Sequence, residues 1–337
     1  MKVKLLTLAV SASLLATGLA YAEGPSFYGR VDASVQKTNK ETATAKDAWE
    51  LVNNDSRFGV KGSDSIDDAT TAFYQIEWGV DVTGDAGANV LSGRNQFAGL
   101  HSETLGDVMI GRMDTPLKAA QGSVDLFNDR AGDMKFLFGS TNTAVFGNNS
   151  GEIRQTNMLA YRSNKIADSL QVNVMVSPGE NVDVDGTAGT ETGLTDSYAA
   201  SVVYDKDGIY GAIAYDSAIQ KWDHVRLVGG VTLGDIRLGG IYQQGQDTAS
   251  ATSLEADGYM LSAAYSLYEG SVVLKGEYGA NKEKNAGATT ADRDLIAVGV
   301  EHPLSKKAKV YAEYVQFKES VANTNDNYLS FGTQVAF

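Results

Sequence analysis

Residues 328–337, Tyr-Leu-Ser-Phe-Gly-Thr-Gln-Val-Ala-Phe, alternate between two kinds of side chain up to the last position of the sequence. The apolar set comprises Leu329, Phe331, Thr333, Val335 and Phe337. A period of two predicts a β-strand with one apolar face. A free edge of this kind invites aggregation in water, whereas it is expected where a closed sheet meets lipid. The stretch therefore predicts the closing strand of a transmembrane β-barrel.

The same alternation recurs along most of the chain. Clear examples are residues 27–36, 72–81, 170–177, 225–233, 236–242 and 259–267. Short turns are expected near Asp67, Gly106, Ala167, Asp207, Gly234, Glu269 and Ser305. Longer polar connections are expected at 37–46, 178–193, 246–256, 281–291 and 319–325. Turns at one end and long loops at the other are typical of membrane barrels. Seven turns between eight hairpins predict a sixteen-stranded antiparallel barrel, an all-β fold.

The first residues have the pattern of a secretory signal peptide. Lys2 and Lys4 precede an apolar stretch over 5–19, and Ala20-Tyr21-Ala22 matches a small-x-small cleavage site. We expect a signal peptide at 1–22 and a single barrel over 23–337. A retained membrane anchor is the alternative.

Composition excludes several classes of function. The chain has no Cys, so disulfides and thiolate metal sites are absent. Its formal charge of −14 becomes −16 without Lys2 and Lys4, which argues against nucleic acid as a partner. The three His residues show no metal-like spacing. We therefore expect neither a cofactor nor a metal.

Residues 114–151 interrupt the alternation over 38 positions. This segment contains Pro116, three aspartates at 125, 129 and 133, and a Gly- and Asn-rich end. A long irregular loop inside a compact fold usually carries function. Because the free space of a barrel is its lumen, we expect the loop to fold inward.

The chain resembles the general diffusion porins of Gram-negative outer membranes over the whole of 23–337. The resemblance is carried by motifs in order: Phe27-Tyr-Gly-Arg30, Ser56-Arg-Phe-Gly-Val-Lys-Gly62, Tyr74-Gln-Ile-Glu-Trp78, Arg94-Asn-Gln-Phe-Ala-Gly-Leu100 and Gly111-Arg-Met-Asp-Thr-Pro-Leu117. Terminal Phe337, with Phe331 and Val335, is similar to the assembly signal of such proteins. Each motif is weak alone, and together in register they are specific.

The resemblance implies a homotrimer of sixteen-stranded barrels, each narrowed by its third long loop. It also implies a basic wall at the constriction, formed here by Arg30, Arg57, Arg94 and Arg154, and Lys61 shares a face with Arg57. The loop lacks the Pro-Glu-Phe-Gly-Gly segment of enterobacterial porins. The facing carboxylates, Asp125, Asp129 and Asp133, are therefore assigned from composition.

These observations lead us to expect a water-filled outer-membrane channel for ions and small hydrophilic solutes, without catalytic activity. The expected partners are further copies of the chain, outer-membrane lipid and lipopolysaccharide, and the outer-membrane assembly machinery. A porin with a saturable solute site and a non-conducting adhesin or structural barrel remain open. An outer-membrane lipase would need a Ser–His pair, and none stands out. The acidic charge favours slight cation preference, whereas the arginines favour anions.

Overall fold

The computed structural model describes residues 24–40, 47–87, 89–139, 150–179, 192–248 and 253–337. The expected signal peptide at 1–22 lies outside these residues. No helix among them has the length and apolar character of a membrane-spanning helix.

The described residues form seventeen strand segments and three short helical segments. The strands are β1 (Ser26–Asn39), β2 (Ala48–Asn53), β3 (Arg57–Ser65), β4 (Thr70–Val80), β5 (Leu91–Ser102), β6 (Gly106–Asp114), β7 (Arg154–Arg162), β8 (Leu170–Ser177), β9 (Ser197–Lys206), β10 (Ile209–Ile219), β11 (Trp222–Leu233), β12 (Ile236–Asp247), β13 (Leu254–Leu267), β14 (Val272–Asn285), β15 (Ala288–Pro303), β16 (Ala308–Glu319) and β17 (Thr324–Ala336). The helical segments are α1 (Pro116–Ala119), α2 (Met134–Phe138) and η1 (Tyr268–Gly270).

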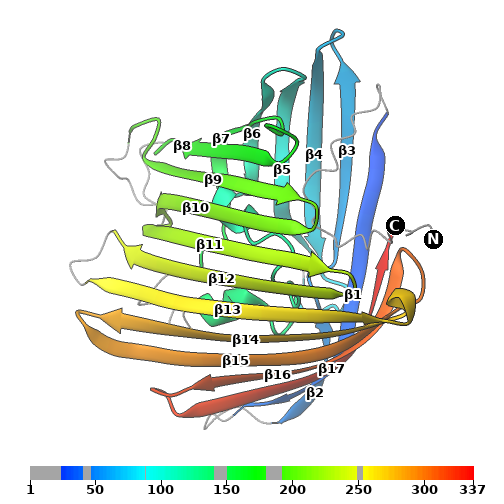
Figure 1. Cartoon of the computed structure of the whole chain (residues 1–337), viewed down its shortest axis with the longest axis vertical. Helices are drawn as coiled ribbons and strands as arrows, with labels where there is room; N and C mark the ends of the chain where they lie inside the picture. The colour runs from blue at the N-terminus through cyan, green and yellow to red at the C-terminus, as the bar shows by residue number, and fades with distance from the viewer. Residues whose placement is uncertain (1–23, 41–46, 88, 140–149, 180–191, 249–252) are drawn as a thin grey trace.

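The strands make one closed antiparallel barrel (Figure 1). From β3 onward each strand pairs with the next, and β17 pairs with one edge of β1. The other edge of β1 pairs with β2 over its second half and with β3 over its first. Because β2 and β3 share one position in the sheet, the seventeen segments form sixteen strands, as predicted.

The barrel closes at the end of the chain. The backbone N–H of Phe337 donates to the carbonyl of Gly29 at 3.0 Å, and the N–H of Gly29 donates back at 3.2 Å. The pairing continues along β1 and β17 from Arg30 opposite Ala336 to Asn39 opposite Asn327. Every strand therefore has a neighbour on both edges, which satisfies the backbone polar groups where lipid offers no hydrogen bonds.

The seven short turns predicted from the sequence are confirmed, because each falls between two consecutive paired strands. The prediction of a long connection at 281–291 is wrong. There β14 and β15 extend until only Ala286 and Gly287 join them, and both have positive φ, 49° and 80°. Two consecutive positive φ values make the tight turn that suits the twist of a hairpin.

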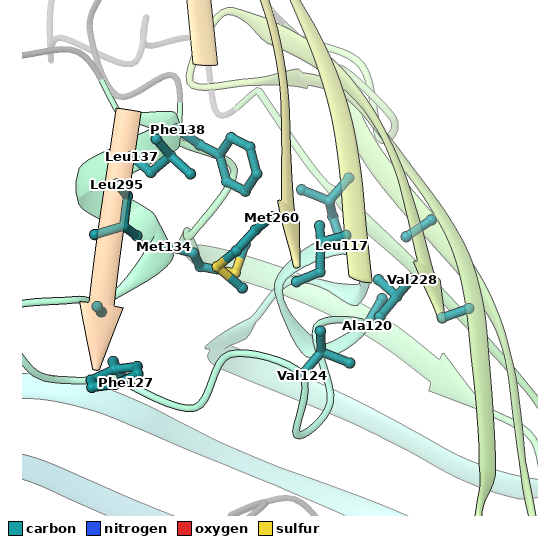
Figure 2. Packing of buried hydrophobic residues seen from close by; sticks show 14 of the residues in the cluster. Leu117, Ala120, Val124, Phe127, Met134, Leu137, Phe138, Val228, Met260 and Leu295 are labelled. Atoms are coloured by element: carbon teal, nitrogen blue, oxygen red, sulfur yellow. The ribbon is translucent and has the colours of Figure 1, made fainter. Parts of the chain in front are cut away.

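The segment between β6 and β7, residues 115–153, is here called the inner loop, and its described residues, 115–139 and 150–153, lie inside the barrel. Its first helix, α1, contacts β8–β11, and α2 contacts β13–β15. Apolar side chains of the loop pack on lumen-facing residues of these strands, as Figure 2 shows for Leu117 near Val228 and Met134 near Met260. A large part of the apolar core is therefore inside the barrel, between the loop and one side of its wall.

The outward faces of the strands carry the opposite set of apolar side chains. Examples along β11 are Val225 and Leu227, which are exposed and alternate with buried Arg226 and Val228. Such alternation is expected when one face meets lipid and the other the lumen. The outer apolar band and the inner apolar core thus use different residues of the same strands.

Closure depends on Gly29, which generates the first prediction. A Cβ at Gly29 would lie 2.5 Å from Cζ of Phe337 and 2.6 Å from the carbonyl oxygen of Arg57. We expect Gly29→Ala to destabilise the barrel by about 1–3 kcal/mol through overpacking. The loss of folded protein with temperature, followed by gel mobility without boiling, measures this effect.

Gly229→Ala is the matched control, because a Cβ at Gly229 meets no atom within 4 Å. Equal melting temperatures for the two variants would show that the packing of Phe337 on Gly29 does not limit stability.

Candidate functional site

The tip of the inner loop is fixed to the barrel wall by one carboxylate. Asp129 has a positive φ of 68°. Its Oδ2 accepts a hydrogen bond from Nη2 of Arg30 in β1 at 2.6 Å and another from Nη2 of Arg57 in β3. Three residues predicted from separate parts of the sequence therefore meet in space.

The two other predicted loop carboxylates have a different role. Asp125 accepts from the backbone N–H groups of Phe127 at 2.9 Å and Met134 at 3.1 Å. Asp133 is the N-cap of α2, accepting from the N–H of Lys135 at 2.7 Å, and it also accepts from the N–H of Asp129 at 2.8 Å. Both are buried and hold the backbone of the loop, whereas Asp129 faces the arginines.

The electrostatic environments of these aspartates differ accordingly. Burial alone would raise the pKa of Asp129, but the charges of Arg57 and Arg30 outweigh it and hold that pKa well below the usual value. For Asp125, burial and then the charge of Asp133 raise the pKa well above the usual value. Asp129 thus stays ionised more firmly than Asp125.

Arg94 in β5 belongs to a second group on the same wall. Its Nε donates to Glu77 of β4 at 2.7 Å, and Glu77 also accepts from the hydroxyl of Tyr28 at 3.2 Å. Nη1 of Arg94 lies 3.7 Å from Oδ2 of Asp55. Asp55 stands in the gap between β2 and β3 with a φ of 52°, and its side chain is 42% exposed.

Sequence reasoning missed Glu77 and Asp55. Glu77 has the alternation parity of a lumen residue, and that parity was a usable signal. Asp55 lies in the break between β2 and β3, directly before the Ser56–Gly62 motif, and no residue pattern marked that break. The break is held by Asn54, whose Nδ2 donates to the hydroxyl of Tyr311 at 2.9 Å and to Ser34 at 3.1 Å.

The two remaining basic residues of the predicted wall lie apart from Asp129. Arg154 begins β7 and pairs with Asp114 at 3.0 Å, and Asp114 also binds Lys118 at 3.1 Å. This group holds the two ends of the inner loop. Lys61 is exposed, with its Nζ 5.5 Å from the ring centroid of Tyr28, rather than beside the carboxylates of the inner loop.

The loop has a second polar anchor at Arg130. Its guanidinium lies 2.7 Å from Glu313, 3.0 Å from Glu301 and 3.3 Å from Asp32, and 3.7 Å from the ring centroid of Tyr311. Burial of Arg130 acts against these charges, which nonetheless raise its pKa. The partners come from β1, β15 and β16, so no local motif indicated this cluster.

Charges are nearly balanced where the loop approaches the wall. Six cations, Arg30, Arg57, Arg94, Lys118, Lys135 and Arg154, face five carboxylates, Asp55, Glu77, Asp114, Asp129 and Asp133. The excess is one positive charge among these residues. Among the described side chains, no group of three or more His, Cys, Asp or Glu residues is placed to hold a metal ion.

Arg112 points to the outside of the barrel, which sequence reasoning did not anticipate. It pairs in register with Gln96, and Gln96 pairs with outward-facing Ile76. No salt bridge to Arg112 occurs within the described chain, and its Nε is buried without a partner there. Of the predicted assembly residues, Phe331 and Val335 are exposed on the outer face, and Phe337 lies at the closing seam.

The profile of the Gram-negative porin family matches residues 7–322. Among curated proteins, the chain is 25% identical to the major outer membrane protein P.IB of Neisseria sicca over 300 residues, covering 86% of this chain and 76% of that protein. It is 26% identical to the outer membrane protein YedS of Escherichia coli over 300 residues, covering 85% and 74%.

Solved structures show the same fold. An anion-selective porin from Comamonas acidovorans has a TM-score of 0.74 at 17% identity, covering 93% of this chain and 99% of that one. OmpF of Salmonella typhi, in complex with daunomycin, has a TM-score of 0.69 at 18% identity, covering 93% and 97%. The chain therefore belongs to the Gram-negative porin family, as an outer-membrane channel through which solutes diffuse passively.

Proposed function

We propose that the inner loop forms the constriction of this channel and that ions and small hydrophilic solutes pass between it and the wall of β3–β7. The observation that carries this proposal is the contact of Asp129 with both Arg30 and Arg57. The two helices of the loop pack on the other side of the lumen, α1 on β8–β11 and α2 on β13–β15. The loop therefore follows one side of the lumen and reaches the basic wall at its tip.

The arrangement supports passive diffusion with weak charge selectivity. Opposed rows of cations and carboxylates create a field across the opening, in which polar solutes can align. Rings of charge at a constriction dominate ion selectivity, but here the six cationic side chains are nearly balanced by the five carboxylates. The acidic chain then contributes a slight preference for cations. Diffusion of this kind requires no catalysis and no cofactor.

We also propose that the protein is a homotrimer joined through the outer face of β3–β6. This face has an apolar groove of about 810 Å³, lined by small residues such as Gly62, Ala72 and Ala98 and bordered by Leu100 and Ile110.

Arg112 lies two residues beyond Ile110 on the same face, where contact with lipid would be costly for a charge. A neighbouring subunit would cover both the groove and Arg112. Vibrio cholerae OmpT, which has the same fold, is described in a trimer form.

Replacing both Arg57 and Arg94 with Gln should increase cation preference and single-channel conductance. The change removes two positive charges from the opening and shortens both side chains. The reversal potential in a salt gradient and the current steps in a planar bilayer measure the two effects. Lys165→Gln, in an exposed turn between β7 and β8, is the control. An unchanged reversal potential and unchanged conductance in the double variant would mean that neither arginine lies at the constriction.

Asp129→Asn should shift the reversal potential towards the value of a more anion-selective channel. The shift should persist at acidic pH. An ordinary aspartate with a pKa of about 3.9 is nearly half protonated at pH 4. The lowered pKa of Asp129 keeps its carboxylate ionised there, because its charge is lost only as pH falls through the folded-state pKa.

The difference between wild type and Asp129→Asn should thus be as large at pH 4 as at pH 7. Asp168→Asn, in an exposed turn, controls for general effects of removing a carboxylate. A difference that vanishes at pH 4 would mean that Arg30 and Arg57 do not hold the carboxylate ionised.

Ala98→Trp should weaken the trimer, because the indole would fill the groove that a neighbouring subunit is proposed to occupy. We expect the trimer band on an unheated gel to disappear at a lower temperature. Ala263→Trp is the matched control, since Ala263 is an exposed outward alanine on β13. Equal effects of the two substitutions would place the interface elsewhere.

A further inference from the structure

Helix α2 presents two different faces. Met134, Leu137 and Phe138 are buried against β13–β15, whereas Lys135 and Phe136 point away from that wall. Phe136 is 49% exposed, and it is the one large apolar side chain in the described part of the inner loop that is exposed. Since an apolar ring in water forgoes the favourable free energy of burial, Phe136 offers a surface that an apolar group of a solute can cover.

Two charged groups of opposite sign lie beside this ring. Nζ of Lys135 is 5.0 Å from the ring centroid of Phe136 and 3.9 Å from Oδ2 of Asp55. The latter distance is too long for a hydrogen bond. The side chains of Lys135 and Asp55 are 34% and 42% exposed, more than those of the other charged pairs around the opening.

The three side chains lie at the level of the basic wall. Oδ2 of Asp55 is 3.7 Å from Nη1 of Arg94, and Lys135 is in turn held by Asp133 at 3.1 Å. Phe136 is thus connected through Lys135 and Asp55 to the side of the opening opposite α2. A solute that passes between the inner loop and the wall, as proposed above, passes this group.

We propose, on the basis of the channel function proposed above, that Phe136, Lys135 and Asp55 form a binding site for zwitterionic solutes with an aromatic ring, the class of free aromatic α-amino acids. The solute carboxylate binds Lys135, its ammonium group binds Asp55, and its ring packs on Phe136. The site is saturable and involves no covalent step.

Physical chemistry favours this class over its neighbours. A zwitterion can enter between Lys135 and Asp55 and compensate both charges. A solute with one charge can pair with only one of these two residues, and it is repelled by the other, which carries a charge of the same sign. Aromatic pairs gain from offset or edge-to-face geometry beyond what an aliphatic group of similar area provides. Both features are needed, so aliphatic zwitterions and singly charged aromatic ions bind more weakly.

The test measures how small solutes block the potassium chloride current, and the zwitterions among them carry no net current themselves. Purified full-length channel in a planar bilayer is titrated with L-phenylalanine, L-leucine, 3-phenylpropanoate and phenethylammonium. We expect the half-blocking concentration of phenylalanine to be about threefold to tenfold lower than that of leucine. The two singly charged aromatic ions should also block less effectively than phenylalanine.

Three substitutions assign the effect to the site. Phe136→Leu should raise the half-blocking concentration of phenylalanine to that of leucine, whereas Phe136→Tyr should keep it low. Asp55→Asn should reduce the advantage of phenylalanine over 3-phenylpropanoate. Phe27→Leu, which removes an exposed ring from the outer face of β1, is the matched control and should change neither value.

Two outcomes would overturn the proposal. One is equal blocking by phenylalanine and leucine in the wild type. The other is a conducting Phe136→Leu channel that phenylalanine blocks as well as it blocks the wild type. A wild-type protein that carries no potassium chloride current at all would instead refute the proposed channel function, and the two failures are therefore distinguishable.

Discussion

The fold depends on one constraint, that no strand edge is left unpaired in lipid. Hydrocarbon offers no hydrogen-bond partner, so each open edge would leave a row of backbone groups unsatisfied at several kcal/mol each. The pairing of β1 with β17 on one edge and with β2 and β3 on the other removes the problem. Closure at sixteen strands also creates a lumen wide enough to hold the inner loop, and the candidate site exists only because that space does.

Inside the lumen, the inner loop combines the two kinds of interaction that soluble proteins use in their cores. Leu117, Met134 and Phe138 pack on apolar residues of the wall (Figure 2), while Arg130 and Asp129 form ion pairs with residues of β1, β3, β15 and β16. Breaking a buried ion pair on one side leaves an uncompensated charge, which is strongly destabilising. The loop is therefore held from both sides, by apolar contacts behind it and by charges at its tip.

The sequence predicted the architecture well because a barrel strand is a local pattern. Alternation and turn residues marked the sixteen strands and all seven short turns, and the 38-residue interruption marked the loop. The failures concern features that are set by distant contacts. The break at Asp55 depends on Asn54 bonding to Tyr311. The expected loop at 281–291 failed because polar residues there continue as paired strands.

The site was predictable only in part, for the same reason. The family resemblance placed Arg30 and Arg57 on the lumen wall, but composition could not separate Asp129 from Asp125 and Asp133. Those three carboxylates differ in what they contact, either two guanidinium groups or backbone N–H groups of the loop. Arg112 was missed because its outward direction emerges from the pairing of β5 and β6.

The seam between β1 and β17 has a consequence for the order of events in folding. Its partners are separated by nearly the whole chain, as in the hydrogen bond from Ser330 to Gln36, which are 294 residues apart. Synthesis begins with the N-terminal end, so the edge of β1 that pairs with β17 stays unpaired until β17 has been made. During that interval the apolar strands are exposed to aggregation. The N-terminal strands thus require protection from aggregation until the C-terminal strands have been made.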